Sequence, residues 1–222
     1  MVASAKSESS QAGEQRWPMA LTLVVAIALP LLLPASISEV TRWVVPVLEA
    51  LLLVILLVAD PGRIDRHTGF VRLISIVLVV ILVAGAGVVT TRLAIVLIDG
   101  GSGTNSAAEL LRVGGLVWLY VIISFAFLYW EFDSGGTVTR TFAPRPYPDL
   151  AFPQELNPRV AASGWRPQFF DYLYLGFTNS TELSPTDVMP LALWAKFAMT
   201  VQATSSLVIL GLVIARAVNI LK

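Results

Sequence analysis

The sequence predicts an all-α integral membrane protein with five or six hydrophobic segments. Of its 222 residues, 56% are hydrophobic and only 14% are charged, whereas soluble domains have about 45–50% apolar residues. The mean hydropathy of +0.76 comes from long apolar runs, and about 20 consecutive apolar residues suffice for a helix to cross a bilayer. These observations together indicate a multi-pass membrane protein.

Charge and residue types exclude several kinds of function. The fifteen basic and fifteen acidic residues cancel, so no overall field favours a nucleic-acid partner. There is no cysteine and only one histidine, which excludes metal sites built from thiolates or several histidines. The sequence also lacks a nucleophile motif with a matching base. We therefore expect no enzymatic activity, no metal and no cofactor.

The first 130 residues divide into a tail and four apolar stretches. Residues 1–16 are small, polar and charged, and they predict a disordered tail. Residues 17–130 predict a four-helix transmembrane region, with apolar stretches at 17–37, 44–59, 73–98 and 110–130. We expect Pro30 and Pro34 to kink or end the first helix, and a cleaved signal peptide is the competing interpretation of this stretch. The third stretch exceeds the ~20 residues needed to cross, which predicts a tilted helix.

The remaining residues change character twice. Residues 131–168 carry six prolines in a polar context, which predicts an irregular extramembrane loop. Residues 169–222 begin with a stretch that is too polar for an ordinary span, and they end in a long apolar helix over 191–221.

The polar stretch at 169–190 reads FFDYLYLGFTNSTELSPTDVMP. Without a gap, it resembles the pore helix, selectivity filter and turn of the tetrameric potassium channels. The matching positions are Asp171, Leu173, Tyr174, Phe177, Asp187 and Pro190, followed by Ala195-Lys196 and Ala215-Arg216 in the last helix. The resemblance implies five transmembrane helices plus a C-terminal re-entrant pore helix and loop. It also implies a tetramer around the last helix, with 110–130 as the outer helix.

The filter itself departs from the channel pattern. In the family, backbone carbonyls replace the ion's hydration shell, and glycines permit the backbone angles that this requires. Here Ser184 and Thr186 replace both glycines, and Pro185 replaces the aromatic residue between them. We therefore expect weakly selective passage of monovalent cations past carboxylates. The candidate residues are Thr181, Glu182, Ser184, Thr186 and Asp187. The alternative is a non-conducting protein whose loop only packs or recruits a partner.

Polar residues inside the apolar segments are further candidates. Gln202 and Ser206 are four residues apart on one face of the last helix, as in a water-lined or helix-contacting stripe, and Arg216 falls in the family's Ala-Arg pair. Glu49 is an intramembrane carboxylate, which favours a proton relay or ion path, or else a hydrogen-bonded position near the interface. The small residues at 84–87, together with 114–115, predict close helix packing.

Two topologies compete. A re-entrant loop entering from outside leaves only five of the fifteen basic residues in the cytoplasm, against the positive-inside rule. A sixth span over 169–183 places eleven there, but 15 residues reach only ~22 Å across a ~30 Å core. Both put the C-terminus in the cytoplasm. We expect a protein of a bacterial plasma or inner membrane, with the lipid bilayer and further copies of itself as partners.

Overall fold

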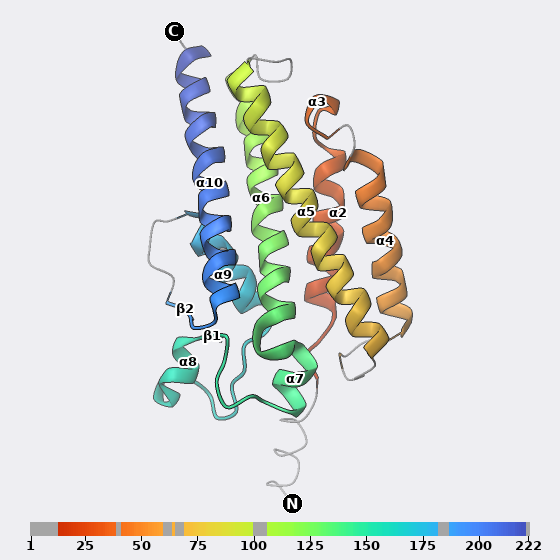
Figure 1. Ribbon diagram of the computed structural model, residues 1–222, viewed down its shortest axis with the longest axis vertical. Helices are drawn as coiled ribbons and strands as arrows, with labels where there is room; N and C mark the ends of the chain where they lie inside the picture. Colours follow the sequence, from red (N-terminus) through yellow and green to blue (C-terminus); the bar gives the residue numbers. More distant parts are fainter. Residues whose placement is uncertain are drawn as a thin grey trace, which may run out of the picture.

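The structure is a computed structural model that describes residues 13–38, 41–59, 64, 69–99, 106–181 and 187–220. Long helices run side by side along its main axis (Figure 1). These helices are α2 (Trp17–Leu31), α4 (Thr41–Ala59), α5 (Gly69–Asp99), α6 (Ala107–Phe132) and α10 (Leu193–Ile220), with the short α3 (Ala35–Ser38) after α2. Four of them, α4, α5, α6 and α10, are long and apolar enough to cross a membrane. The prediction of an all-helical fold is confirmed, and these four helices fit a membrane protein by their length and composition.

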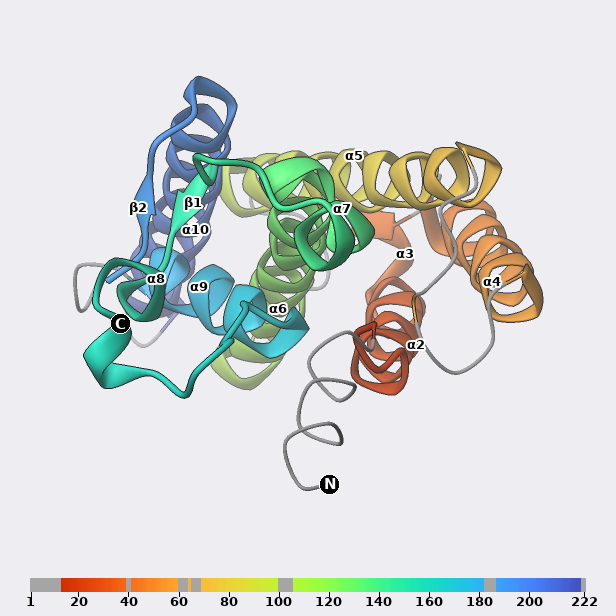
Figure 2. The same ribbon diagram turned by 90° about the horizontal axis from the view of Figure 1, so that it is seen from below.

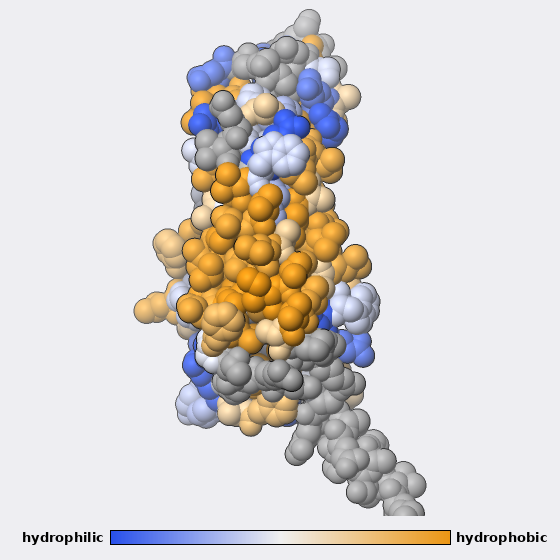
Figure 3. Space-filling model, turned by 90° about the vertical axis from the view of Figure 1, so that its right-hand side faces the viewer, coloured by the Kyte–Doolittle hydropathy of each residue, from blue (hydrophilic) through white to orange (hydrophobic). Residues whose placement is uncertain are grey.

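The surface has the distribution expected of a bilayer protein. Figure 3 shows apolar side chains covering the middle of one face, with hydrophilic ones gathered toward its two ends. We call the base the end of the bundle where α2 and α10 begin and α6 ends (Figure 1). Trp17 and Phe70 are 60% and 65% exposed at the base ends of α2 and α5, a position typical of aromatic residues at a membrane interface.

Helix α6 is the centre of the bundle, because it packs against α2, α5, α9 and α10. It begins at Ser106, whose hydroxyl accepts a hydrogen bond from the Glu109 amide at 3.2 Å, as an N-cap residue does. Helix α5 has 31 residues and a length of ~46 Å, and it crosses the bundle obliquely in Figure 1. The first apolar stretch gives a helix of only 15 residues, which carries Pro30 in its last turn and is followed by Pro34.

The proline-rich region is more ordered than the sequence indicates. Helix α6 continues to Phe132, past the expected boundary at residue 130. Short elements follow it at the base: η1 (Asp133–Gly135), α7 (Thr137–Phe142), β1 (Leu150–Ala151), α8 (Pro153–Leu156) and η2 (Pro158–Val160). Two of the prolines are the first residues of α8 and η2, where a missing N–H costs nothing. Proline therefore begins these helical turns instead of preventing them.

The segment that resembles a pore loop contains α9 (Phe169–Thr181), which has 13 residues and a length of ~20 Å. It begins at the base, where the Phe169 ring lies 5.7 Å from that of Trp130 at the end of α6. The chain is back at the base at β2 (Met189–Pro190), which pairs antiparallel with β1. The Leu191 amide then donates a 2.9 Å hydrogen bond to the Asp149 carbonyl. Both flanks of this segment thus lie at the same end of the bundle.

Candidate functional site

Helix α9 packs closely against the middle of α6 because residue 176 is a glycine. A Cβ at Gly176 would lie 3.0 Å from the Ile122 carbonyl oxygen and 3.5 Å from the Ala126 Cβ. Ile122 is ten residues before Phe132 in a helix of 26 residues, or ~15 Å from its base end. The C-terminal half of α9 therefore reaches about halfway along α6.

Gln202 of α10 holds this half-length helix through its side-chain amide. Its Nε2 donates to the Gly176 carbonyl at 2.7 Å and to the Ser180 hydroxyl at 2.8 Å. Its Oε1 accepts from the Tyr129 hydroxyl at 2.6 Å and from Asn179 Nδ2 at 2.8 Å. Gln202 is fully buried, and these four bonds use both donors and both lone pairs of an amide. The stripe expected around Gln202 is thus a helix-contacting one at this residue.

The polar side chains in the last turn of α9 are satisfied within the same region. Asn179 also donates to the Met199 carbonyl of α10 at 3.0 Å. The hydroxyls of Thr178 and Thr181 donate to carbonyls of α9 itself, at 3.0 Å and 3.1 Å. Because lipid offers no hydrogen bonds, such internal pairing is what a polar segment at membrane depth requires.

The structure separates the remaining pore candidates. Thr181 is half-buried at the end of α9, whereas Asp187 is exposed at the base. Asp187 lines a small pocket that it shares with Asp171, Tyr174 and Thr178. The candidates Glu182, Ser184 and Thr186 lie outside the described residues.

The candidates on α10 differ in their surroundings. Ser206 lies one turn beyond Gln202 and is fully buried, and its hydroxyl has no hydrogen-bond partner in the part of the chain that the structure describes. Arg216 is half-buried near the opposite end of α10 from the base.

Glu49 lies in a separate place, because α4 is on the opposite side of the bundle from α9 and α10 (Figure 2). It is fully buried, and one carboxylate oxygen accepts a 3.2 Å hydrogen bond from the Tyr120 hydroxyl of α6. The other oxygen has no partner among the described residues. A Cβ at Gly85 of α5 would lie 2.8 Å from the Tyr120 hydroxyl, so this glycine makes room for the contact.

The predicted close approach of small residues holds at two positions and not at two others. Gly85 faces Tyr120, and a Cβ at Gly114 would lie 2.6 Å from a methyl group of Val213 in α10. By contrast, nothing lies within 4 Å of where Gly87 and Gly115 would carry a Cβ.

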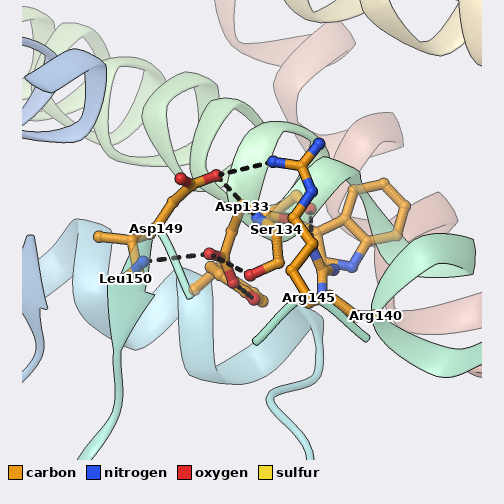
Figure 4. A network of polar contacts seen from close by, with 8 residues as sticks. Asp133, Ser134, Arg140, Arg145, Asp149 and Leu150 are labelled. Carbon is orange, nitrogen blue, oxygen red and sulfur yellow. Dashed lines mark hydrogen bonds and ion pairs between the residues drawn. The ribbon is translucent and has the colours of Figure 1, made fainter. Parts of the chain in front are cut away.

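Sequence reasoning missed a polar network at the base, which Figure 4 shows from close by. At its centre is the buried Asp133, directly after α6. Its carboxylate accepts hydrogen bonds from the Tyr172 hydroxyl at 2.5 Å, the Leu150 amide at 3.1 Å and the Ser134 hydroxyl at 3.1 Å. One side chain therefore joins the end of α6 to both α9 and β1.

Two arginines and a second aspartate complete this network. The buried Arg140 of α7 donates to the carbonyls of Trp130 and Asp133, each at 2.7 Å, and its guanidinium lies 5.0 Å from the centre of the Tyr172 ring. Asp149 accepts from the Ser134 amide at 3.0 Å and lies 4.0 Å from Arg145 as an ion pair.

The backbone of this network requires unusual conformations. Ser134 has φ 52°, and Gly135 and Gly136 have φ of 84° and 92°, a region that favours glycine. The signal in the sequence was Asp-Ser-Gly-Gly directly after an apolar helix, which is typical of a turn with a required geometry.

Glu14 ties the chain ahead of α2 to the same end. Its carboxylate accepts hydrogen bonds from Trp130 Nε1, at 3.0 Å, and from the Phe169 amide at the start of α9. Burial raises the pKa of Glu14 above the ordinary 4.5, and these hydrogen bonds offset only part of that effect. Residues 13–16, expected to belong to a disordered tail, are thus packed on the base because Glu14 has partners there; residues 1–12 lie outside the described part.

Comparison with protein-family models, curated proteins and solved structures finds no match to this chain. Among the described residues, no group of three or more His, Asp or Glu side chains is arranged to hold a metal ion. The site is therefore interpreted from its own geometry.

Proposed function

We propose that this chain is a pore-loop type of membrane protein, in which the α6–α9–α10 unit admits small cations with weak selectivity. The observation that carries the proposal is the path of the chain around α9. The helix begins at the base, reaches about halfway along α6, and the chain is back at the base by Met189. An outer helix, a half-length helix and an inner helix are the three parts of the pore module that the sequence resembles.

The partial charge at the C-terminal end of α9 favours a cation as the permeating ion. The C-terminal end of a helix carries a partial negative charge, and half-helices that end inside membranes present their terminal carbonyls to cations in transporters. Here that end is Thr181, at the depth of the middle of α6, and Glu182 follows in the sequence. Gln202 has no remaining hydrogen-bonding capacity, so its part is to fix α9 in position. Selection would come from the Glu182 and Asp187 carboxylates instead of a ladder of carbonyls.

Passage would require several copies of the chain around α10, as the resemblance implies. The exposed face of α10 carries Thr200, Thr204 and Gly211 among larger apolar residues. Small and hydroxyl-bearing residues favour contact between membrane helices. This face is therefore our candidate for the surface between copies.

The distribution of basic residues favours a cytoplasmic base. Among the described residues, seven basic side chains belong to the base ends of the elements: Arg16, Arg72, Arg140, Arg145, Arg159, Arg166 and Lys196. Four belong to the opposite ends: Arg42, Arg92, Arg112 and Arg216. By the positive-inside rule, α9 would enter from the cytoplasm and the C-terminus would be outside. This orientation is opposite to the cytoplasmic C-terminus expected from the sequence.

A non-conducting role is the second candidate, and the Gln202 contacts favour it. A helix whose inner polar groups are all paired within one chain serves equally well as a fixed packing element. In that case the loop would contribute to stability or partner binding without a path for ions.

Ion flux into liposomes separates the two candidates. We expect wild-type protein to pass monovalent cations, and Glu182→Gln and Asp187→Asn to reduce the flux. Glu109→Gln is the matched control, because Glu109 is a half-buried carboxylate at the far end of α6 from the base. Absence of flux at any voltage with correctly folded protein would overturn cation passage, and equal flux in all variants would exclude selection by the carboxylates.

Labelling of single cysteines tests the orientation, since the chain has none of its own. Tyr147, which is 83% exposed at the base, and Asn219, exposed near the opposite end, are suitable positions. With a cytoplasmic base, a membrane-impermeant reagent on intact cells labels Asn219→Cys and leaves Tyr147→Cys unlabelled. The reverse pattern would contradict the proposed orientation.

A further inference from the structure

A small pocket lies at the base between α2, α5 and the junction of α6 with α7. Its walls include Arg16, Met19, Val71, Arg72, Trp130 and Glu131. The cavity volume is about 50 Å³, enough for a few water molecules or a small polar group. Its lining includes none of the Gln202 partners and none of the candidate residues for the cation path.

The unexplained group in this pocket is the carboxylate of Glu131. Its side chain is only 8% exposed, and no hydrogen bond joins its carboxylate to another described residue, although the charges of Arg140 and Arg72 act on it. Arg140 is near, but its guanidinium donates to Trp130, Asp133 and Thr137. A buried carboxylate is costly unless donors satisfy it, so this pocket calls for a ligand with N–H or O–H groups.

The residues around the pocket indicate an amphiphilic ligand with a basic group at its polar end. Trp17 and Phe70, the exposed aromatic residues at the base, are the sequence neighbours of the pocket residues Arg16 and Val71. One part of its wall is apolar, from Met19 and Val71. Arg72 is exposed at its rim, where a guanidinium suits a phosphate.

We propose that this pocket binds the headgroup of a phospholipid that carries a primary amine, with the ammonium donating to Glu131 and the phosphate against Arg72. A primary ammonium has three N–H donors, as the carboxylate requires. A choline headgroup is bulkier and has none, so the pocket discriminates between the two headgroups. This inference stands independently of cation passage.

Competitive lipid retention tests the proposal. Purified protein is equilibrated with equal amounts of phosphatidylethanolamine and phosphatidylcholine of identical acyl chains, and bound lipid is measured by mass spectrometry. We expect wild-type protein to favour the ethanolamine lipid by at least about fivefold, because the bond to the charged group is lost with choline. Glu131→Gln should bring the ratio close to one, and Arg72→Gln should lower retention of both lipids, since both carry the phosphate.

Two controls keep the test decisive. Glu109→Gln, at the far end of α6, should retain the wild-type preference. Soluble phosphoethanolamine, added as a competitor, distinguishes a lipid from a free small molecule: weak competition supports the lipid, and complete displacement at equal concentration would assign the site to a soluble amine.

If Glu131→Gln does not fold, Arg72→Gln decides the test, because unchanged retention of both lipids in that variant would overturn the proposal. Equal retention of both lipids by wild type, or an unchanged ratio in Glu131→Gln, would overturn it as well.

Discussion

The hydroxyl of Tyr172 donates a 2.5 Å hydrogen bond to Asp133, and so joins the first turn of α9 to the residue that follows α6. The same ring lies under the Arg140 guanidinium and meets Phe152 edge-on, with 5.2 Å between ring centres. Tyr172 is fully buried. This pair therefore fixes where the half-length helix starts relative to the central helix.

Tyr172→Phe tests the strength of that link. The variant keeps the aromatic contacts and removes the hydrogen bond to a carboxylate, so we expect a loss of about 1.5–3 kcal/mol in the free energy of unfolding. The measurement is denaturant unfolding in detergent. Tyr147→Phe is the control, because Tyr147 is 83% exposed and its hydroxyl should contribute nothing. Equal stability of the two variants would show that the Asp133 contact does not hold α9.

Gln202→Leu removes four side-chain hydrogen bonds, three that join α10 to α9 and one that joins α10 to Tyr129 of α6. It leaves Gly176, Ser180 and Tyr129 without these partners, and we expect a loss of about 2–4 kcal/mol, since each membrane hydrogen bond contributes roughly 0.6–1.7 kcal/mol. Thr200→Val, on the exposed face of the same helix, should change stability by less than ~0.5 kcal/mol. A small effect of Gln202→Leu would mean that other groups or water replace the amide.

Gly85→Ala should weaken the hydrogen bond of Glu49, although Gly85 acts on it only through Tyr120. Its new methyl group would lie 2.8 Å from the Tyr120 hydroxyl, so the ring must move away from Glu49. We expect destabilisation by about 1–3 kcal/mol, because a buried acid loses its donor. Gly87→Ala is the matched control, since nothing lies within 4 Å of its Cβ position. Adding Glu49→Gln to Gly85→Ala should recover part of the loss, and no recovery would argue against Glu49 as the source of the cost.

Stability should depend on pH through Glu14. Because its pKa is raised by folding, the folded state holds the proton more tightly, and the contribution to stability is present below pH 4.5 and is lost as the pH rises through the raised pKa. Glu14→Gln abolishes this titration. The difference in thermal midpoint between wild type and variant should therefore change above pH 4.5. A difference that is constant across the titration would contradict a raised pKa at this residue.

The positions of the long apolar helices could be predicted from the sequence, because their composition alone marks them as membrane-spanning. Uninterrupted apolar runs indicate α4, α5, α6 and α10, because backbone groups in lipid must be paired within a helix. The short length of α2 follows from Pro30 and Pro34, which were visible in the sequence. An apolar run does not show how far its helix continues into the flanking residues. For this reason the end of α6 at Phe132, two residues past the apolar run, was not predicted.

The contacts that build the candidate site could not be predicted from the sequence. Gln202 was identified as a candidate by its position in an apolar helix, but its partner Tyr129 is 73 residues away. The Asp133 network likewise joins Tyr172 and Leu150, which no local pattern relates. Side-chain pairs of this kind depend on the packing of helices, and periodicity along one helix gives no information on them.

The Gln202 contacts also impose an order on the assembly of the protein. The Gln202 partners on α9 find no donors or acceptors in lipid, and Gln202 emerges from the ribosome 22 residues after Ser180. The start of α9 can already dock through Tyr172 and Asp133, whereas its C-terminal half lacks the Gln202 contacts until α10 has entered the bilayer. The inner end of the half-length helix is by this logic the last part of the bundle to be fixed in place, although it is not the last to be synthesised.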